Sequence, residues 1–536
     1  MDLLEKARHW ADHDPDPETA RQIRELVEAD DLVALGEAFA GPLTFGTAGL
    51  RAAIGPGESR MNRAVVMRAT AGLVTWLKSK VEDPVVVIGC DARHGSSQFA
   101  RDAAGVVSAA GGTALVLPEQ NPTPLTAFAV KLHGADAGIM VTASHNPPQD
   151  NGYKVYLGGR VATGEAEGVQ LVSPADKEIA EAIAGMPMAD EIEVASHYKN
   201  IDPRDEYVQR AVSLAGDETD VTIALTAMHG VGAQLGKRVL EEAGFTVSLV
   251  PEQAEPDPEF PTVAFPNPEE PGALDLAKAH AEKVGADVII AYDPDADRCA
   301  VALGDRQLTG DETGALLGDY LARRGVGGAM ANSVVSSRLL GKVAAGHGLD
   351  HATTLTGFKW IARTPELSLG YEEAIGFCCD PQAVADKDGV GTSVVLASLV
   401  GELKAQGKTL LDALDDLARE HGLYQTAPLT FRVADLSLIA KGMETLRVNP
   451  PKELAGSAVA QVLDLAEDPL GIGATDGMMF VTEANDRVIC RPSGTEPKLK
   501  CYLEVVLPVQ GDEVPREEAE ARLGVISAEL RKHLGM

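Results

Sequence analysis

The chain has 536 residues and a formal net charge of −33, from 47 basic and 80 acidic side chains. This acidity argues against a nucleic-acid partner, because a phosphate backbone requires a basic protein face. No apolar run is long enough to span a bilayer, so we expect no membrane partner. At about 150 residues per domain, the length predicts three or four domains.

The N-terminal residues and the cysteines indicate the compartment of the protein, and the charge bears on its substrate. The first residues lack the basic start and apolar stretch of a signal peptide, and the six cysteines show no CxxC spacing. We therefore expect a reduced, cytoplasmic protein. If the substrate is anionic, the few basic side chains should be concentrated around its site, where they reverse the local potential.

Residues 3–40 are patterned as helices, with Pro17 in the first turn of the second one. A helix–strand alternation then begins and runs through three rounds. The first round predicts helices at 64–80, 96–110 and 124–133, with strands at 85–93, 113–119 and 137–141. The second and third rounds predict strands at 222–232, 245–252, 286–298, 329–337, 353–362 and 367–377, with helices at 273–284 and 311–324 between them.

The fold class that follows is α/β, with three related α/β units and mixed sheets. The end of the chain differs, because residues 477–506 alternate like antiparallel strands around turns and residues 516–534 form an amphipathic helix. We expect a smaller C-terminal α+β domain there. The proline- and acid-rich run 251–274 is interpreted as a surface loop of the second unit.

Ser144 follows an apolar run in the first unit. Residues 137–141 stop at Thr142-Ala143-Ser144-His145-Asn146, and two prolines follow. Such a loop should lie at the carboxyl edge of a parallel sheet, where ligands bind. Ser144 is therefore a candidate nucleophile, with His145 and Lys154 nearby in sequence, although serine in such a loop is also a common turn or cap residue.

The DPDADR stretch, Asp293 to Arg298, closes a buried strand of the second unit. Its alternate carboxylates, Asp293, Asp295 and Asp297, suit a hard-oxygen Mg²⁺ site. An EF-hand would need Gly and Glu where Arg298 and Gly304 stand, so it is excluded. A haloacid-dehalogenase-type phosphatase would need Thr or Val at position 297.

Further candidate ligands follow in the third and fourth parts of the chain. GYEEAIGF offers Glu372 and Glu373 for sugar hydroxyls, and Lys359 and Lys387 add cations, although each signal is weak alone. RPSGTEPK is more specific, because an arginine fork, hydroxyls and backbone amides together suit a phosphate. Its candidate residues are Arg491, Ser493, Gly494 and Thr495, with Lys498 after them. A plain β-turn would not require basic residues at both ends.

The motifs TASHNP, DPDADR, GYEEAIG and RPSGTEPK, in this order, resemble those of the α-D-phosphohexomutase superfamily. FGTAGLR, residues 45–51, resembles the N-terminal signature of its phosphoglucomutase branch. The resemblance covers nearly the whole chain. It implies four domains around a central cleft, which we place at 1–212, 213–309, 310–426 and 427–536.

The resemblance also implies roles for the motif residues. Ser144 would be the phosphoserine and, with Asp293, Asp295 and Asp297, would bind Mg²⁺. The substrate would be bound by Arg298, Lys359, Glu372, Glu373, Arg491, Ser493, Gly494 and Thr495. The remaining catalytic candidates are Arg51, His145, Lys154 and Lys387, and the residues alone do not decide which group is the general acid or base. Ala374 stands where the family usually has serine, which removes one hydrogen bond to the sugar.

The activity that the resemblance implies is that of a phosphoglucomutase. It would interconvert glucose 1-phosphate and glucose 6-phosphate through a phosphoserine enzyme and a glucose 1,6-bisphosphate intermediate. A phosphomannomutase or phosphopentomutase would use the same mechanism. A phosphosugar phosphatase and a non-catalytic phosphosugar-binding protein are the alternatives from other classes. We expect small-molecule phosphosugar partners and a monomer or weak homodimer.

Overall fold

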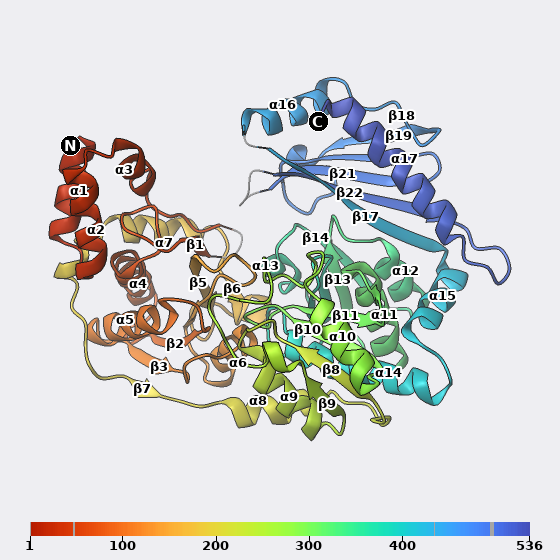
Figure 1. Ribbon diagram of the computed structural model, residues 1–536, viewed down its shortest axis with the longest axis horizontal. Coiled ribbons are helices and arrows are strands. Elements are labelled where there is room, and N and C mark those ends of the chain that lie inside the picture. Colours follow the sequence, from red (N-terminus) through yellow and green to blue (C-terminus); the bar gives the residue numbers. More distant parts are fainter. Residues whose placement is uncertain (1, 47–48, 434, 494–497) are drawn as a thin grey trace. The chain divides into compact units, whose positions relative to one another are not determined.

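The computed structural model describes residues 2–46, 49–433, 435–493 and 498–536 (Figure 1). The chain divides into two compact units. The first comprises Met1–Leu308 with Gly376–Glu402, and the second comprises Thr309–Ile375 with Leu403–Met536. Among the described residues, no helix is both long and apolar enough to cross a membrane.

Short capped helices begin the first unit: α1 (Leu3–Asp12), α2 (Pro17–Glu28) and α3 (Leu32–Ala38). Asp2 and Glu5 form a capping box on α1, and Pro17 begins α2 as the sequence predicts. Trp10, Ile23 and Leu35 lie in one small apolar cluster, which also includes Ala64 and Ala189. This cluster joins the three helices to later residues of the first unit.

The first sheet has the strand order β1-β5-β4-β2-β3-β7, with β6 paired to β5. Its strands are β1 (Leu50–Ala53), β2 (Val85–Cys90), β3 (Thr113–Val116), β4 (Ala137–Val141), β5 (Asp150–Leu157), β6 (Val169–Gln170) and β7 (Lys199–Asn200). The continuous apolar runs of β2 and β4 become parallel neighbours that are buried on both faces. β5 returns antiparallel to β4, and β1 pairs antiparallel with β5.

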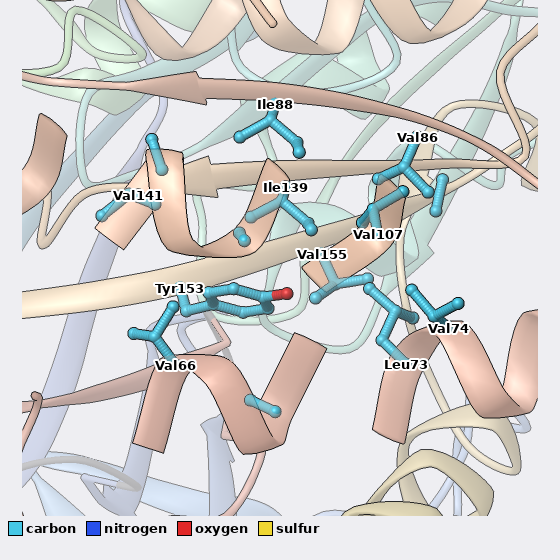
Figure 2. Packing of buried hydrophobic residues seen from close by; sticks show 14 of the residues in the cluster. Val66, Leu73, Val74, Val86, Ile88, Val107, Ile139, Val141, Tyr153 and Val155 are labelled. Carbon is cyan, nitrogen blue, oxygen red and sulfur yellow. The ribbon is translucent and has the colours of Figure 1, made fainter. Parts of the chain in front are cut away.

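Helices cover this sheet: α4 (Arg63–Lys78), α5 (Ser96–Ala109), α6 (Thr123–Leu132) and α7 (Ala175–Ala184). Figure 2 shows how side chains of α4, such as Leu73, meet Ile139 of β4 and Tyr153 and Val155 of β5. The phenolic oxygen of Tyr153 is 2.9 Å from the hydroxyl of Thr70, so its polar end is satisfied within the core. This packing holds β4, which ends just before the Ser144 loop, and β5, which contains Lys154.

The second sheet of this unit has the order β12-β11-β10-β8-β9. Its strands are β8 (Thr222–Thr226), β9 (Thr246–Leu249), β10 (Val288–Tyr292), β11 (Cys299–Leu303) and β12 (Arg306–Gln307), with helices α8 (Arg204–Val212), α9 (Gly232–Glu242) and α10 (Asp275–Val284). β8 lies parallel to both β9 and β10, while β11 is antiparallel to β10. The Asp293–Arg298 loop is therefore the connection between β10 and β11.

The segment 251–274 has no strand or α-helix, as expected, but it is not simply a surface loop. It begins with a 3-10 turn, Pro251–Gln253, and the side chain of Gln253 accepts a hydrogen bond from Thr226 at 2.6 Å. Phe260 is 3% exposed, and its ring lies against the guanidinium of Arg93, which follows β2. The apolar side chains among its prolines hold this segment against the protein.

The second unit contains β13 (Ala329–Ser333), with β14 (Asp350–Thr354) and β15 (Leu367–Glu372) parallel to it on either side. Helices α11 (Gly310–Arg323), α12 (Leu339–Gly346), α13 (Phe358–Ile361) and α15 (Leu410–His421) connect or cover these strands. The strand predicted at 353–362 is wrong beyond Thr354, because the observed strand shares only its first two residues. β14 ends at Thr354, opposite the end of β13, and Gly357 with φ 111° opens the helical turn α13 instead.

The last sheet is antiparallel throughout, with the order β17-β22-β21-β20-β19-β18. Its strands are β17 (Leu423–Arg432), β18 (Glu453–Leu454), β19 (Ser457–Asp464), β20 (Met478–Thr482), β21 (Arg487–Pro492) and β22 (Lys498–Leu507). α16 (Ser437–Val448) and α17 (Arg516–Leu534) pack on it, α17 through residues spaced at helical intervals: Ala519, Leu523, Ile526 and Leu530. The predicted α+β domain is confirmed.

Residues 376–402 return the chain to the first unit. They contain β16 (Gly376–Cys378), the DKDG loop and most of α14 (Gly389–Ala405). Tyr292 of β10 and Ser393 of α14 join their hydroxyls at 2.6 Å in the interior. Lys387 therefore belongs to the first unit, although it is distant in sequence from the other residues of that unit.

Candidate active site

Ser144 lies in a left-handed backbone conformation at the end of β4. Its φ is 52°, a value that costs energy for a residue with a side chain, and it is 3% exposed. The hydroxyl of Thr142 accepts a hydrogen bond from the Ser144 amide at 3.0 Å. The Ser144 hydroxyl donates to Oδ2 of Asp293 at 2.7 Å, so the predicted nucleophile meets the predicted metal loop.

The Asp293–Arg298 loop gathers its three carboxylates. Asp293, Asp295 and Asp297 are at most 1% exposed, and one oxygen from each lies within 4.8 Å of the others. The turn is closed by Ala296, with φ 54°, and the Arg298 amide donates to Oδ1 of Asp293 at 3.1 Å. Among the described residues, Oδ1 of Asp295 and Oδ1 of Asp297 have no hydrogen-bond partner although they are buried. Buried carboxylate oxygens without a hydrogen-bond partner are suitable ligands for a metal ion. The three aspartates therefore fit a metal site.

Cations surround the three carboxylates. Lys154, which is 2% exposed on β5, donates to Oδ2 of Asp295 and to Oδ2 of Asp297, at 2.8 Å each. Lys387 approaches the same oxygen of Asp297 at 3.2 Å. Arg298 has its Nε 3.7 Å from Oδ1 of Asp297. Three cations thus face three carboxylates, which is what allows so many charges to be buried together.

The pKa values of these groups follow from burial and from the pairing. Burial, with the charges of Asp295 and Asp297, raises the pKa of the Asp293 carboxyl well above its ordinary value. Burial would also raise the pKa of Asp297, but Lys154, then Lys387 and Arg298, outweigh it and hold that pKa below the ordinary value. The carboxylate that is hydrogen-bonded to Ser144 therefore differs electrostatically from the one that is paired with lysines.

Gly389 allows the DKDG loop to bring Lys387 close to Asp297. A Cβ at this position would lie 2.4 Å from the carbonyl oxygen of Arg298 and 2.8 Å from that of Ala296. The Gly389 amide donates to the Ala296 oxygen at 3.2 Å. The two loops can approach only because glycine has no side chain.

Arg51 and His145 complete the predicted group in the first unit. Arg51 lies on β1 and its Nη1 donates to the side-chain oxygen of Asn146 at 3.0 Å. His145 has its Nδ1 3.9 Å from Oδ2 of Asp293. Burial, then the charges of Arg298 and Arg51, lowers the pKa of the imidazole well below its ordinary value.

The second unit brings the other predicted residues together around residues 356–359. Lys359 lies on α13, whose first turn is held by Glu372, since Oε1 of Glu372 accepts from the Gly357 amide at 2.8 Å. Arg491, on β21, donates from Nη1 to the hydroxyl of Thr356. The predicted sugar motif and the predicted phosphate motif therefore meet at one segment of the chain.

Glu373 and the end of the phosphate motif have different surroundings. Oε2 of Glu373 accepts hydrogen bonds from Ser333 and Ser336, at 3.1 Å each. The Ser493 amide donates to the Lys498 carbonyl at 2.8 Å, which continues the β21–β22 pairing. Gly494 and Thr495 lie outside the described residues.

The sequence did not single out several residues of the site. Thr123, the first residue of α6, donates its hydroxyl to Oδ2 of Asp295 at 2.6 Å and its amide to the Asp295 carbonyl at 2.9 Å. Arg93 follows β2 and contacts the backbone of the Ser144 loop. Phe265 of the 251–274 segment has its ring centroid 6.4 Å from that of His145. The sequence could have indicated Arg93, because it is a polar residue at the end of a predicted parallel strand. Nothing in the sequence indicated Phe265.

Comparison with known proteins gives consistent results along the chain. Family models of the phosphoglucomutase/phosphomannomutase α/β/α domains I, II and III match residues 42–186, 205–306 and 309–421. The model of the C-terminal domain of the same family matches residues 446–521. The matches follow one another in the order expected from the motifs.

The alignments with curated relatives cover most of this chain and most of each relative. A probable phosphomannomutase of Haemophilus influenzae is 46% identical over 83% of this chain and 93% of its own. A Homo sapiens phosphopentomutase is 34% identical over 99% of this chain and 95% of its own, and a Staphylococcus aureus phosphoglucomutase is 31% identical over 91% and 94%. These relatives carry three different substrate names.

Solved structures share the fold. A structure from Thermus thermophilus has a TM-score of 0.73 at 25% identity, covering 92% of this chain and 99% of its own. The phosphoglucomutase pp63/parafusin from Paramecium has a TM-score of 0.72 at 20% identity, covering 93% and 97%. The second likeness concerns the fold alone.

Proposed function

Because this chain belongs to the phosphoglucomutase/phosphomannomutase family, whose members are mutases of the isomerase class, we propose that it moves a phosphoryl group between two hydroxyls of one sugar through Ser144. The proposed reaction interconverts glucose 1-phosphate and glucose 6-phosphate, with glucose 1,6-bisphosphate as the intermediate. The observation that supports it best is the 2.7 Å hydrogen bond from the Ser144 hydroxyl to Asp293 inside the buried carboxylate group.

The proposed first step starts from phosphorylated Ser144. The bond between Oγ of Ser144 and phosphorus breaks, a bond from the sugar hydroxyl to phosphorus forms, the hydroxyl proton passes to a base of the site, and an acid of the site protonates Oγ of Ser144. In the second step a base removes that proton from Oγ, Oγ bonds to the phosphorus of the other phosphate of the bisphosphate, and an acid protonates the sugar oxygen that leaves. The general acid and base are among Arg51, His145, Lys154 and Lys387.

The three aspartates have a defined part in this proposal. Mg²⁺ bound by Asp293, Asp295 and Asp297, with an oxygen of phospho-Ser144, would supply two positive charges to match the nearly two negative charges of the phosphoryl group. Lys154, Lys387 and Arg298 already balance the carboxylates themselves. Oδ2 of Asp293 holds the Ser144 hydroxyl in place after transfer.

The proposed substrate-binding residues are those of both motifs in the second unit, and Arg298 is a further candidate. Arg491 and Ser493, with Gly494 and Thr495, would bind the phosphate that does not react, because arginine forks and small hydroxyl residues recognise phosphate oxygens. Glu372, Glu373 and Lys359 would bind the sugar. Holding the distal phosphate restricts the motion of the substrate, which is the main contribution that a protein makes to phosphoryl transfer.

The names of the relatives support two further substrates. The relative at 46% identity is named a probable phosphomannomutase, and a relative aligned over 99% of this chain is named a phosphopentomutase. Ala374 lies in the sugar motif and has no hydroxyl to offer to the sugar. Mannose 1-phosphate and ribose 1-phosphate are therefore the alternative substrates of the same mechanism.

Mass spectrometry of the intact protein tests the phosphoserine. After incubation with glucose 1,6-bisphosphate the wild type should carry one added phosphoryl group, and Ser144→Ala should carry none. Ser108→Ala, on helix α5, which packs against β2 and β3 of the first sheet, serves as the matched control and should be phosphorylated like the wild type. A wild type without the group, together with isomerisation by Ser144→Ala, would contradict the proposal.

Steady-state kinetics test the substrate and the reaction class. The values of kcat/KM on the 1-phosphates of glucose, mannose and ribose, measured side by side, identify the preferred sugar. A higher kcat/KM on mannose or ribose 1-phosphate would replace glucose in the proposal. Steady release of inorganic phosphate without isomerisation would indicate a phosphatase instead.

A further inference from the structure

We propose that Arg93 is a positioning residue for phosphoryl transfer, which holds the Ser144 loop in its left-handed conformation by binding the backbone of that loop. The inference rests on the proposed role of Ser144 as the phosphate carrier. Arg93 is far from Ser144 in sequence and is not part of the motifs from which the function was inferred.

The guanidinium of Arg93 binds carbonyl oxygens along the whole loop. Nη2 donates to the carbonyl of Ser144 at 2.7 Å and to that of Asn146 at 2.5 Å. Nη1 donates to the carbonyl of Pro147 at 2.7 Å and to that of Asp150 at 3.1 Å. One rigid, planar group therefore determines where these backbone oxygens lie relative to one another.

These contacts explain how a strained residue is kept in place. Ser144 has φ 52°, a region that residues with a Cβ seldom occupy unless the surroundings impose it. Its carbonyl points to Arg93 and its hydroxyl to Asp293, on opposite parts of the same residue. Loss of the first contact would allow the peptide to relax and move the hydroxyl away from the carboxylates.

Arg93 is itself held from two directions. The Arg93 amide donates to Oδ1 of Asp91 at 2.9 Å, and Oδ2 of Asp91 is 3.4 Å from Nε. The ring of Phe260, from the 251–274 segment, covers the guanidinium at 5.1 Å from its centroid. The side chain is 1% exposed, so its orientation is fixed within the protein.

The geometry separates positioning from direct substrate binding. The four N–H groups on Nη1 and Nη2 are matched by four carbonyl contacts, and Nε faces Asp91. A phosphate could be bound only by displacing backbone contacts of the loop. Arg93 is therefore expected to act through Ser144, and its replacement should change kcat rather than KM.

Arg93→Lys keeps the charge but removes the fork. We expect kcat to fall about 100-fold, because small displacements of a reacting group cost about this much, while KM for the sugar phosphate stays within about threefold. The rate at which Ser144 is phosphorylated by glucose 1,6-bisphosphate should fall with kcat. Arg63→Lys is the matched control, since Arg63 on α4 forks onto the buried Asp102 at 2.7 and 2.9 Å. It makes the same chemical change and should lower the melting temperature with kcat unchanged.

Hydrogen exchange of residues 142–150 gives a readout that does not depend on catalysis. Exchange there should rise in Arg93→Lys and not in Arg63→Lys. Phe260→Leu uncovers the guanidinium without removing it and should give a smaller increase in exchange. This variant tests the inference if Arg93→Lys does not fold. Unchanged exchange in both Arg93→Lys and Phe260→Leu would overturn the inference.

Kinetics then separate the positioning role of Arg93 from the proposed role of Ser144 as phosphate carrier. A kcat within about threefold of wild type, or an increase in KM equal to the loss in kcat, would overturn the positioning role. If exchange of the loop rises but Ser144→Ala proves fully active, the assignment of Ser144 as phosphate carrier fails while the structural contact of Arg93 stands. If Ser144→Ala is inactive and Arg93→Lys shows the kcat loss with unchanged KM, both proposals are supported.

Discussion

Lys154→Met removes the cation that contacts two of the three buried carboxylates. The Lys154 Nζ lies 2.8 Å from Oδ2 of Asp295 and from Oδ2 of Asp297, and the side chain is 2% exposed. Methionine has similar length and volume, so the substitution removes charge without leaving a large cavity. The expected result is local destabilisation of the sheet and loops around the carboxylates.

The size of the effect follows from the distances. At an effective dielectric constant of about 20, each 2.8 Å contact is worth roughly 6 kcal/mol before desolvation. Most of this is offset by the cost of burying the charges, and breaking a buried pair from one side costs about 3–5 kcal/mol. Asp297 keeps Lys387 at 3.2 Å, while Asp295 keeps the hydroxyl of Thr123, so Asp295 should account for most of the loss.

Hydrogen exchange measured by mass spectrometry is suited to this protein, because global unfolding of a chain with several domains is not two-state. In the presence of a chelator, the opening free energy of residues 137–157 should fall by about 3–5 kcal/mol in Lys154→Met. Lys387→Met is the matched control and should show a smaller loss, because Lys387 makes longer contacts and Asp297 keeps Lys154. A Lys154→Met value within about 1 kcal/mol of wild type would refute the reasoning.

Addition of Mg²⁺ extends this experiment. A ligand present at about 100 times its dissociation constant for the folded state stabilises that state by about 2.7 kcal/mol. Mg²⁺ on the same carboxylates would replace part of the missing charge, so Mg²⁺ should protect residues 288–303 more strongly in Lys154→Met than in the wild type. Protection by Mg²⁺ in neither protein would show that the three aspartates are not the metal site.

Two other predictions concern the second unit and the fate of the phosphoryl group. Burial raises the pKa of Asp311 to about 7 from 3.8, so the folded state holds a proton that the unfolded state releases between these values. The stability of the region around α11 should therefore fall by up to about 4 kcal/mol as the pH rises from about 4 to 7. The opening free energy of residues 310–323, measured by hydrogen exchange, should depend less on pH in Asp311→Asn than in wild type, and parallel profiles would contradict this. Phe265→Ala should expose the loop of Ser144 beside His145, so phosphorylated enzyme should lose its phosphoryl group to water several-fold faster, as followed by intact mass. An unchanged rate of loss would show that the ring does not exclude water.

Local patterns determined much of the fold. The apolar runs of β2 and β4 are buried on both faces whatever follows them, because such segments are stable only inside a sheet. The three aspartates were predictable as one site, since a short loop after a strand can turn them to one point. The α+β end was visible in the alternation of residues 477–506. The strand predicted beyond Thr354 failed, because a strand ends where its partner ends.

Only the tertiary structure decided which distant groups meet. The antiparallel register of β4 and β5 sets Lys154 opposite Met140, and the return of residues 376–402 brings Lys387 to Asp297. No local pattern predicts that Arg93 binds the carbonyls of the Ser144 loop. Composition and spacing report local preferences, whereas these contacts depend on strand order, register and the close approach allowed at Gly389. The sequence by itself therefore determined the chemical groups of the site, and the packing of separate segments decided their partners and their charge balance.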